Sequence, residues 1–117
     1  GLSICYDLRF PELYRRQVDA GAEVLLVVAA WPAARADAWR TLVRARAIES
    51  LAAIVACNAA GLDRGSACAG ASAAWDARGG PLGELGPEPG ALRVEIDPAA
   101  IRAARGDFPA LRDRRLG

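Results

Sequence analysis

The hydrophobic residues in the first 60 positions alternate between strand-like and helix-like stretches. Residues 2–5, 23–30 and 53–58 are short and almost wholly apolar, a pattern typical of central strands that are covered on both faces. Between them, residues 11–20 and 38–52 carry apolar positions at helical spacing. The β-α-β-α-β order predicts a parallel sheet with right-handed crossovers, covered by helices on at least one face.

The expected helix ends coincide with residues that favour such positions. Pro11 suits the first position of a helix, and Gly21 suits a helix stop. Asp37 can cap the second helix through its side-chain oxygen.

The second half of the chain predicts antiparallel structure. Turn residues at 77–80 and 86–90 separate short apolar segments, as in hairpins. The fold class is therefore α/β with a mixed sheet and covering helices. The expected elements are a loop at 59–70, strands at 71–76, 81–85 and 91–96, and a short helix at 98–105.

Composition and charge are those of one globular domain. The chain has 117 residues, of which 53% are hydrophobic and 25% are charged. Its 15 basic and 14 acidic residues are interleaved except in a terminal Arg cluster, which we interpret as a solvated end. We therefore expect no nucleic-acid partner. No apolar run approaches the ~20 residues of a membrane span and no signal peptide is recognisable, so we expect no membrane association.

The residue types that are absent restrict the possible chemistry. The chain has no His, no Met and no Lys, so it cannot supply a Ser-His or Cys-His pair, a lysine base or a His-metal site. Because it starts with Gly and lacks Met, we expect a piece of a longer protein. Its three cysteines have no CxxC spacing, which predicts free thiols in a reducing cytoplasm and neither a metal nor a cofactor.

Cys5 is the strongest candidate for chemistry. It lies where a strand ends and a tight turn leads toward a helix, a geometry that exposes a nucleophile near N–H groups that favour a thiolate and an oxyanion. The alternative is a buried structural cysteine, since free cysteines are among the most buried residues.

Several segments, in the same order, resemble motifs of the nitrilase (carbon–nitrogen hydrolase) superfamily. They are GLSICYDLRFPEL at 1–13, Gly-Ala-Glu at 21–23, Trp31-Pro32 with Arg35 and Trp39, RARAIE at 44–49, Cys57-Asn58 with Gly61, and Gly70 with Ser72. The resemblance covers almost the whole chain.

The resemblance implies a fold and a mechanism. Its members are α-β-β-α sandwiches with a Glu-Lys-Cys triad, so residues 1–117 would be the C-terminal part of one such domain, with the Glu and Lys in an absent N-terminal half. Cys5 would be the nucleophile, and the backbone N–H of Tyr6 an oxyanion donor. The thiolate would attack a small amide and water would hydrolyse the thioester. We expect the 117 residues alone to be inactive.

Other polar and aromatic residues have two possible roles each. Asp7, Arg9 and Glu49 could look catalytic, but we expect them to form structural ion pairs in which Arg9 and Arg46 are the cations. Trp31 is expected to line the substrate pocket or to be core. Asn58 is expected to be a structural cap or a pocket edge. For Cys57 and Cys68 we expect structural or incidental positions.

The subfamily and the function class stay open. Trp31-Pro32, Arg35 and Cys57-Asn58 are most similar to ω-amidases that act on α-keto acid amides, although Ala38 and Ser50 depart from common family residues. N-carbamoyl amines are an alternative substrate class. A non-catalytic assembly module is an alternative function.

A Cys-His hydrolase or a glutamine amidotransferase is disfavoured, because the chain has no His and no small residues beside Cys5. The family resemblance also implies a homo-oligomer that pairs through the helices at 11–20 and 38–52.

Overall fold

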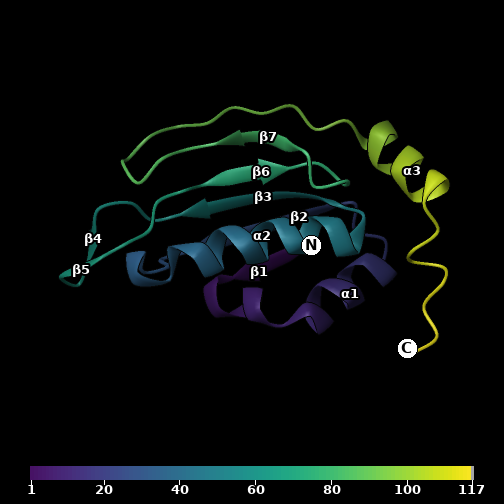
Figure 1. The fold of residues 1–117 in the computed structure, drawn as a ribbon, viewed down its shortest axis with the longest axis horizontal. Helices are drawn as coiled ribbons and strands as arrows, with labels where there is room; N and C mark the ends of the chain where they lie inside the picture. Colours follow the sequence, from purple (N-terminus) through teal and green to yellow (C-terminus); the bar gives the residue numbers. More distant parts are fainter. Residues whose placement is uncertain (117) are drawn as a thin grey trace.

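A five-stranded sheet runs through the molecule, and helices α1 and α2 lie over one of its faces (Figure 1). The computed structural model describes residues 1–116. The strands are β1 (Leu2–Ile4), β2 (Val24–Ala29), β3 (Ala53–Asn58), β4 (Leu62–Asp63), β5 (Ser66–Ala67), β6 (Ala73–Trp75) and β7 (Pro81–Glu84). The helices are α1 (Pro11–Asp19), α2 (Ala36–Ser50) and α3 (Pro98–Asp107), with 3-10 helices η1 (Cys5–Arg9) and η2 (Ala33–Arg35).

The sheet is mixed, as the sequence predicts. Its order is β1-β2-β3-β6-β7, with β1, β2 and β3 parallel and β6 and β7 antiparallel to their neighbours. The register aligns Ile4 with Val28 and Val28 with Cys57. The next residues of the three parallel segments, Cys5, Ala29 and Asn58, therefore follow at the same carboxyl edge.

The core lies between the sheet and the two covering helices. Alternate residues of β2 and β3 point toward the helices, because side chains of a strand alternate between its faces. The aromatic residues Tyr14 of α1 and Trp39 of α2 are fully buried in the same cluster. The buried strand residues of this cluster are Leu25, Val27, Ile54 and Ala56.

The opposite face of the sheet is partly open. Leu2 is 74% exposed, Ile4 66%, Leu26 42% and Val28 54%. Strands whose apolar residues suit cover on both faces thus leave one face partly exposed within residues 1–116. The expectation of a central strand is wrong only for β1, which is an edge strand. An apolar side chain is suited to burial, but it becomes buried only where another element of the structure packs over it.

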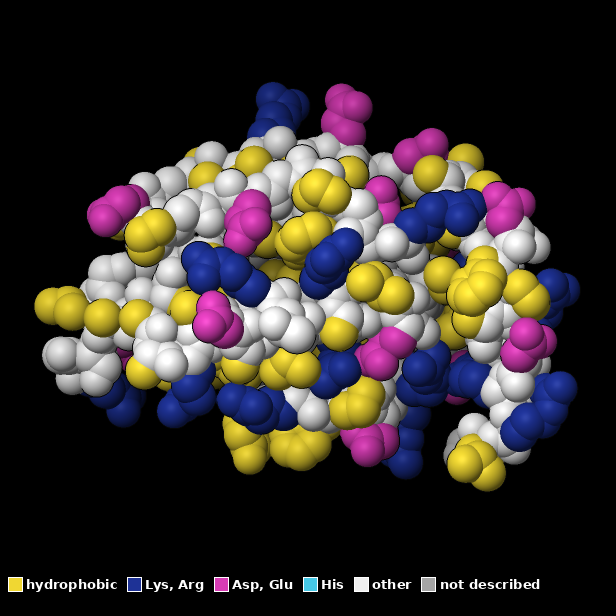
Figure 2. Space-filling view, in the orientation of Figure 1, with side chains coloured by type: hydrophobic (Ala, Val, Ile, Leu, Met, Phe, Trp, Pro, Cys, Tyr) yellow, Lys and Arg dark blue, Asp and Glu magenta, His cyan; other side chains and the backbone are white. Residues whose placement is uncertain are grey.

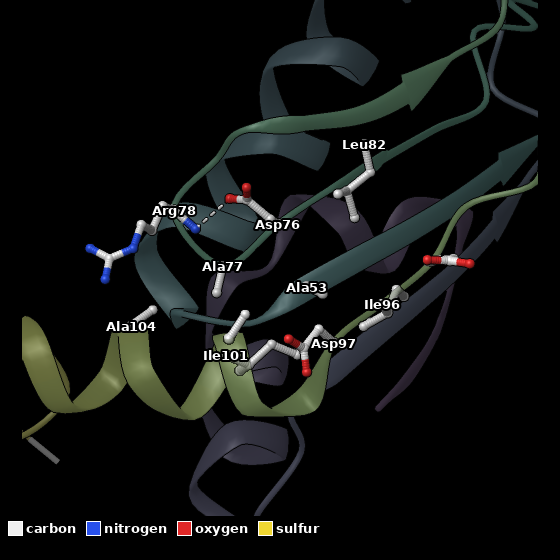
Figure 3. Close-up of a pocket in the computed structure, with 11 residues that line it drawn as sticks. Ala53, Asp76, Ala77, Arg78, Leu82, Ile96, Asp97, Ile101 and Ala104 are labelled. Atoms are coloured by element: carbon white, nitrogen blue, oxygen red, sulfur yellow. Dashed lines mark hydrogen bonds between the residues drawn. The ribbon is translucent and has the colours of Figure 1, made fainter.

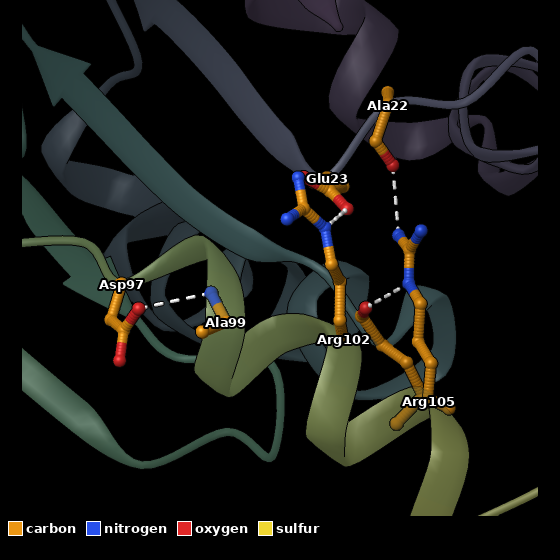
Figure 4. A network of polar contacts seen from close by, with 7 residues as sticks. Ala22, Glu23, Asp97, Ala99, Arg102 and Arg105 are labelled. Atoms are coloured by element: carbon orange, nitrogen blue, oxygen red, sulfur yellow. Dashed lines mark hydrogen bonds and ion pairs between the residues drawn. The ribbon is translucent and has the colours of Figure 1, made fainter.

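Helix α3 covers one end of that open face. Val24 and Ala53 alternate with the helix-facing residues of their strands, and they pack against a cluster that includes Ile101 and Ala104 of α3. Arg102 donates to both carboxylate oxygens of Glu23, at 2.7 and 3.1 Å (Figure 4).

Two further contacts hold α3 in place. Arg105 donates to the carbonyl oxygens of Leu51 and Ala22, both at 2.8 Å. The Asp97 side chain caps the start of the helix by accepting a hydrogen bond from the Ala99 N–H at 2.9 Å (Figure 4).

Several expected boundaries shift. Helix α2 ends where Leu51 adopts a left-handed φ of 43°, and Asp37 lies in its first turn, not at its cap. The loop at 59–70 contains the small β4–β5 hairpin.

The expected strand at 91–96 is wrong, because that segment has no regular structure. Leu92 packs directly over Gly83, where a built Cβ would lie 2.8 Å from the Leu92 Cδ1 atom. The alternation of residues 91–96 thus reflects packing without a hydrogen-bonded ladder.

Charges of both signs are interspersed on the surface. Figure 2 shows Arg side chains next to acidic side chains over the face that it displays. Within residues 1–116, every helix is too short or too polar to cross a bilayer.

Candidate active site

Cys5 occupies a strained backbone position directly after β1. Its φ of 45° lies in the left-handed region, which is uncommon for a residue other than Gly. It is the first residue of η1, and its side chain is half-buried. The carboxylate of Asp7 accepts a hydrogen bond from the Ile4 N–H at 2.9 Å and so holds the strand end against the turn. Strain at a cysteine is a reason to suspect function there.

The turn that carries Cys5 is anchored to α2 by a buried arginine. Arg46 donates to the Leu8 carbonyl oxygen from Nε at 3.1 Å and from Nη2 at 2.8 Å. Its Nη1 atom lies 2.8 Å from the Glu49 Oε1 atom, and its guanidinium carbon lies 5.6 Å from the centre of the Tyr14 ring. The Tyr14 hydroxyl is hydrogen-bonded to Ser3 Oγ at 2.8 Å, which extends this network beneath β1.

A cavity of about 300 Å³ opens beside the cysteine. Two arginines are among its lining residues, and the guanidinium of Arg9 lies over the Trp31 ring at 5.1 Å from its centre. The complete lining is Cys5, Tyr6, Arg9, Trp31, Pro32 and Arg35. Residues from two neighbouring strand ends therefore meet at the carboxyl edge of the sheet.

Trp31 is both a cavity residue and a core residue. It lines the cavity, yet only 3% of its surface is exposed, and its ring lies 5.7 Å from that of Trp39. Its backbone N–H donates to Asn58 Oδ1 at 2.7 Å, and its indole Nε1 donates to the Arg35 carbonyl oxygen at 2.8 Å.

The Asn58 side chain is hydrogen-bonded to the backbone of two other segments. Its Nδ2 atom donates to the Gly70 carbonyl oxygen at 2.9 Å and to that of Trp31 at 3.3 Å. It lines a different cavity of about 220 Å³, which it shares with Cys57 and Ser72. The structure thus ties Asn58 to the backbone next to Trp31 without placing it in the cavity of Cys5.

The expected ion pairs are present only in part. Arg46 and Glu49 form one, with Glu49 about one-third exposed. The expectation is wrong for Asp7 and Arg9: within residues 1–116, Asp7 caps the turn and Arg9 stacks on Trp31, and neither forms an ion pair. Asp7 accepts a hydrogen bond from a backbone N–H close by in the chain, and Arg9 lies over an aromatic ring. Charge complementarity alone predicts neither contact.

The remaining cysteines differ in exposure. Cys57 is exposed on the open face. Cys68 is buried, and its backbone forms an isolated antiparallel β-bridge with Pro32. All three cysteines are free thiols. Within residues 1–116, no group of three or more acidic, Cys or His side chains is arranged to hold a metal ion.

A cavity of about 210 Å³ beneath α3 is unrelated to Cys5. Its walls are mainly apolar and include Ala53, Ala77 and Ile101 (Figure 3). Asp76 at its rim accepts hydrogen bonds from the N–H groups of Arg78 and Gly80, both at 2.8 Å. This carboxylate therefore serves the β6–β7 turn.

Sequence reasoning missed three residues of the Cys5 cavity, of which Arg9 was expected in an ion pair. Pro32 and Arg35 were noted only as part of a resemblance, although they directly follow the carboxyl end of β2. Their place could have been anticipated, because the carboxyl ends of parallel strands share one edge of a sheet. The structure thus places a strained cysteine beside a cavity at the carboxyl edge of the sheet.

The chain belongs to the carbon-nitrogen hydrolase family, whose sequence profile matches residues 1–106. It is 42% identical over 115 residues to the 2-oxoglutaramate amidase of Paenarthrobacter nicotinovorans. This match includes 98% of the chain but only 39% of the relative. The chain thus spans about two fifths of the length of that relative.

Solved structures of carbon-nitrogen hydrolases and amidases are similar to this chain. A CN-hydrolase superfamily protein from Xanthomonas campestris, with an arsenic adduct in its active site, is 39% identical with a TM-score of 0.90, covering 99% of this chain and 46% of that one. A mutant amidase from Nesterenkonia sp. AN1 carries the acetamide moiety of fluoroacetamide on its active-site cysteine. It is 35% identical with a TM-score of 0.83, covering 97% of this chain and 40% of that one. The fold is about half of a nitrilase-type sandwich.

Proposed function

We propose that this chain carries the nucleophile of an amidase that cleaves small, non-peptide amides, with Cys5 as the attacking group. The observation that supports it most is the left-handed Cys5 at the carboxyl end of β1, facing a cavity lined by Trp31 and two arginines. The amidases among the relatives, one of which is modified at its active-site cysteine, support the same reaction class.

The reaction follows from thiolate chemistry. The Cys5 sulfur adds to the amide carbon, and the carbonyl oxygen becomes an oxyanion for which the Tyr6 backbone N–H is the donor carried over from the family. The C–N bond then breaks, and the nitrogen leaves with a proton as ammonia or an amine. Water attacks the thioester, which releases the carboxylic acid and restores the thiol. The family's Glu base and Lys donor lie outside these residues.

The open face of the sheet supports an assignment of residues 1–117 to the C-terminal part of one carbon-nitrogen hydrolase domain. The exposed row of Leu2, Ile4, Leu26 and Val28 is apolar surface of the kind that proteins cover with another element. The N-terminal remainder of such a domain is the cover we propose, and it would also supply the base. Without that remainder we expect no hydrolysis of amides.

Labelling of Cys5 tests the proposal. In a protein that joins these residues to the N-terminal half of the domain, iodoacetamide should alkylate Cys5 with loss of iodide, as read by peptide mass spectrometry. Cys5→Ala should abolish both labelling and amide hydrolysis, whereas the matched control Cys57→Ala should retain both. If Cys57→Ala or Cys68→Ala removes activity as completely as Cys5→Ala, the assignment is wrong.

The finer expectations belong to the same proposal. An ω-amidase substrate is favoured over an N-carbamoyl amine, and the free thiols favour a reducing cytoplasm. The complete protein should form a homodimer through α1 and α2, measured by size-exclusion chromatography with light scattering.

The alternative is a non-catalytic assembly module, which the open apolar face favours. It would be supported if the 117-residue chain bound a partner through that face and the complete protein hydrolysed no amide.

A further inference from the structure

The left-handed backbone of Cys5 has to be held by its surroundings, because this conformation is unfavourable by itself. For a residue with a side chain, it lowers the population by a factor of about 5–30 relative to the right-handed conformation. The φ of Cys5 is nevertheless 45°. Such a conformation persists only where neighbouring contacts fix it. The contacts on either side of Cys5 therefore have to supply what its own backbone does not.

The backbone is well fixed before and after Cys5 but less so at Cys5 itself. On one side, Ile4 is paired with β2 in the sheet. On the other side, Leu8 is fully buried, and its carbonyl oxygen accepts two hydrogen bonds from Arg46. Between these points Cys5 is only half-buried, and Tyr6 is 67% exposed. Packing alone therefore holds this part of the turn loosely.

A side-chain hydrogen bond of Asp7 spans this stretch. The Asp7 carboxylate accepts the Ile4 N–H at 2.9 Å, which closes a ring around Cys5 and Tyr6. The Asp7 carbonyl oxygen also accepts the Phe10 N–H at 2.9 Å, so the same residue holds the end of η1. Hydrogen bonds to a carboxylate are stronger than those between neutral groups. This one is therefore suited to offset the cost of the left-handed conformation.

We propose that Asp7 is a positioning residue, whose carboxylate holds Cys5 in its left-handed conformation and so directs the thiol toward the cavity. This rests on the proposed amidase function, in which Cys5 attacks the amide carbon. Asp7 does not line the cavity, so it acts through the backbone of Cys5 and not through the substrate. A misplacement of about 1 Å at a reacting atom can cost about 100-fold in rate, which gives this hydrogen bond its importance.

The conformational role can be measured without turnover, because glycine adopts a left-handed φ at no steric cost. In the complete domain, which joins these residues to the N-terminal half, Cys5→Gly should be more stable than Cys5→Ala. Its equilibrium constant for unfolding in urea should be about fivefold smaller. In an Asp7→Ala background this difference should shrink below about twofold, because the turn can relax. A difference that persists without Asp7, or no difference in the parent, would overturn the proposal.

The matched control is Asp97→Ala. The Asp97 side chain likewise accepts one backbone N–H, from Ala99 at 2.9 Å, but it caps α3 and does not line the Cys5 cavity. Asp7→Ala and Asp97→Ala each remove one carboxylate and one hydrogen bond to the backbone. In the Asp97→Ala background, Cys5→Gly and Cys5→Ala should still differ about fivefold. An equally reduced difference in both backgrounds would refute a specific role of Asp7.

Hydrolysis of a short amide by the complete domain gives a second readout. Asp7→Ala should lower kcat about 10- to 100-fold and leave KM within about twofold, because the nucleophile is displaced while the cavity lining is intact. Asp7→Asn should retain kcat within about threefold, since its amide oxygen can accept the same hydrogen bond. An Asp7→Asn variant as slow as Asp7→Ala, or a loss confined to KM, would contradict the positioning role.

The two readouts separate this proposal from the broader one. If the parent hydrolyses no small amide, the amidase proposal fails, whereas the unfolding comparison still decides whether Asp7 holds the backbone of Cys5. If the parent is active but the difference between Cys5→Gly and Cys5→Ala does not depend on Asp7, the positioning role fails and the amidase proposal stands. Agreement of both readouts would support Asp7 as the residue that positions the nucleophile.

Discussion

Arg46 should be the arginine of α2 whose loss destabilises the protein most. Its side chain is only 6% exposed, and two of its nitrogens donate to the Leu8 carbonyl oxygen in the turn after Cys5. Hydrogen bonds from a charged group contribute about 1.5–3 kcal/mol, and we count these two as one because they share an acceptor. The Glu49 pair adds about 0.5 kcal/mol, since Glu49 is 34% exposed. Arg46→Met should therefore cost about 2–3.5 kcal/mol.

The matched control lies on the same helix. Arg40 pairs with Glu84 at 3.2 Å, but these side chains are 43% and 39% exposed. An ion pair this exposed contributes about 0–1 kcal/mol, so Arg40→Met should be nearly neutral. Methionine keeps most of the stem of either arginine, so the comparison isolates the guanidinium.

The assay is urea unfolding followed by tryptophan fluorescence, at one protein concentration because association shifts apparent stability. If Arg46→Met proves too unstable to measure, Arg46→Lys should show an intermediate loss, since it keeps the charge but loses the fork of donors. Iodoacetamide labelling of Cys5 should also change in Arg46→Met, because the turn loses its anchor. Equal free energies of unfolding for Arg46→Met and Arg40→Met would refute this reasoning.

Three further outcomes are expected. Burial raises the pKa of Tyr14 above its ordinary 10.0. The contribution of the neutral Tyr14 to the free energy of unfolding is therefore complete below pH 10 and is lost as pH rises through the higher pKa of the folded state. Tyr14→Phe should reduce this alkaline loss of stability in unfolding experiments. The Arg102 hydrogen bond lowers the pKa of Glu23 below 4.5, so α3 should loosen only as pH falls through that lowered value. NMR shifts of α3 should report this, and Glu23→Gln should remove it. Leu26→Lys on the open face should reduce self-association of the chain, whereas an unchanged mass by light scattering would argue against that face.

Local sequence determined most of the secondary-structure elements and the turn that carries Cys5. Proline at the start of α1, helical spacing in α2 and apolar runs in β2 and β3 are preferences of neighbouring residues, so their elements are recognisable without the rest of the fold. The place of Cys5 at a strand end was recognisable in the same way, because the strand and the turn are adjacent in the chain. Its role as a nucleophile was assigned from the family resemblance and stays a proposal. The 91–96 segment shows the limit: alternation predicts which side chains are half-buried, but a strand also needs a partner backbone.

Tertiary structure decided which residues meet. Arg46 reaches the Leu8 carbonyl oxygen across 38 positions, and Trp31 reaches Asn58 across 27, so no local pattern predicts either contact. Arg9 was expected to form an ion pair, yet it stacks on Trp31 because the two strand ends bring that ring to it. The open face was decided in the same way: the amino acids of β1 and β2 suit burial, but burial depends on whether another layer packs against them.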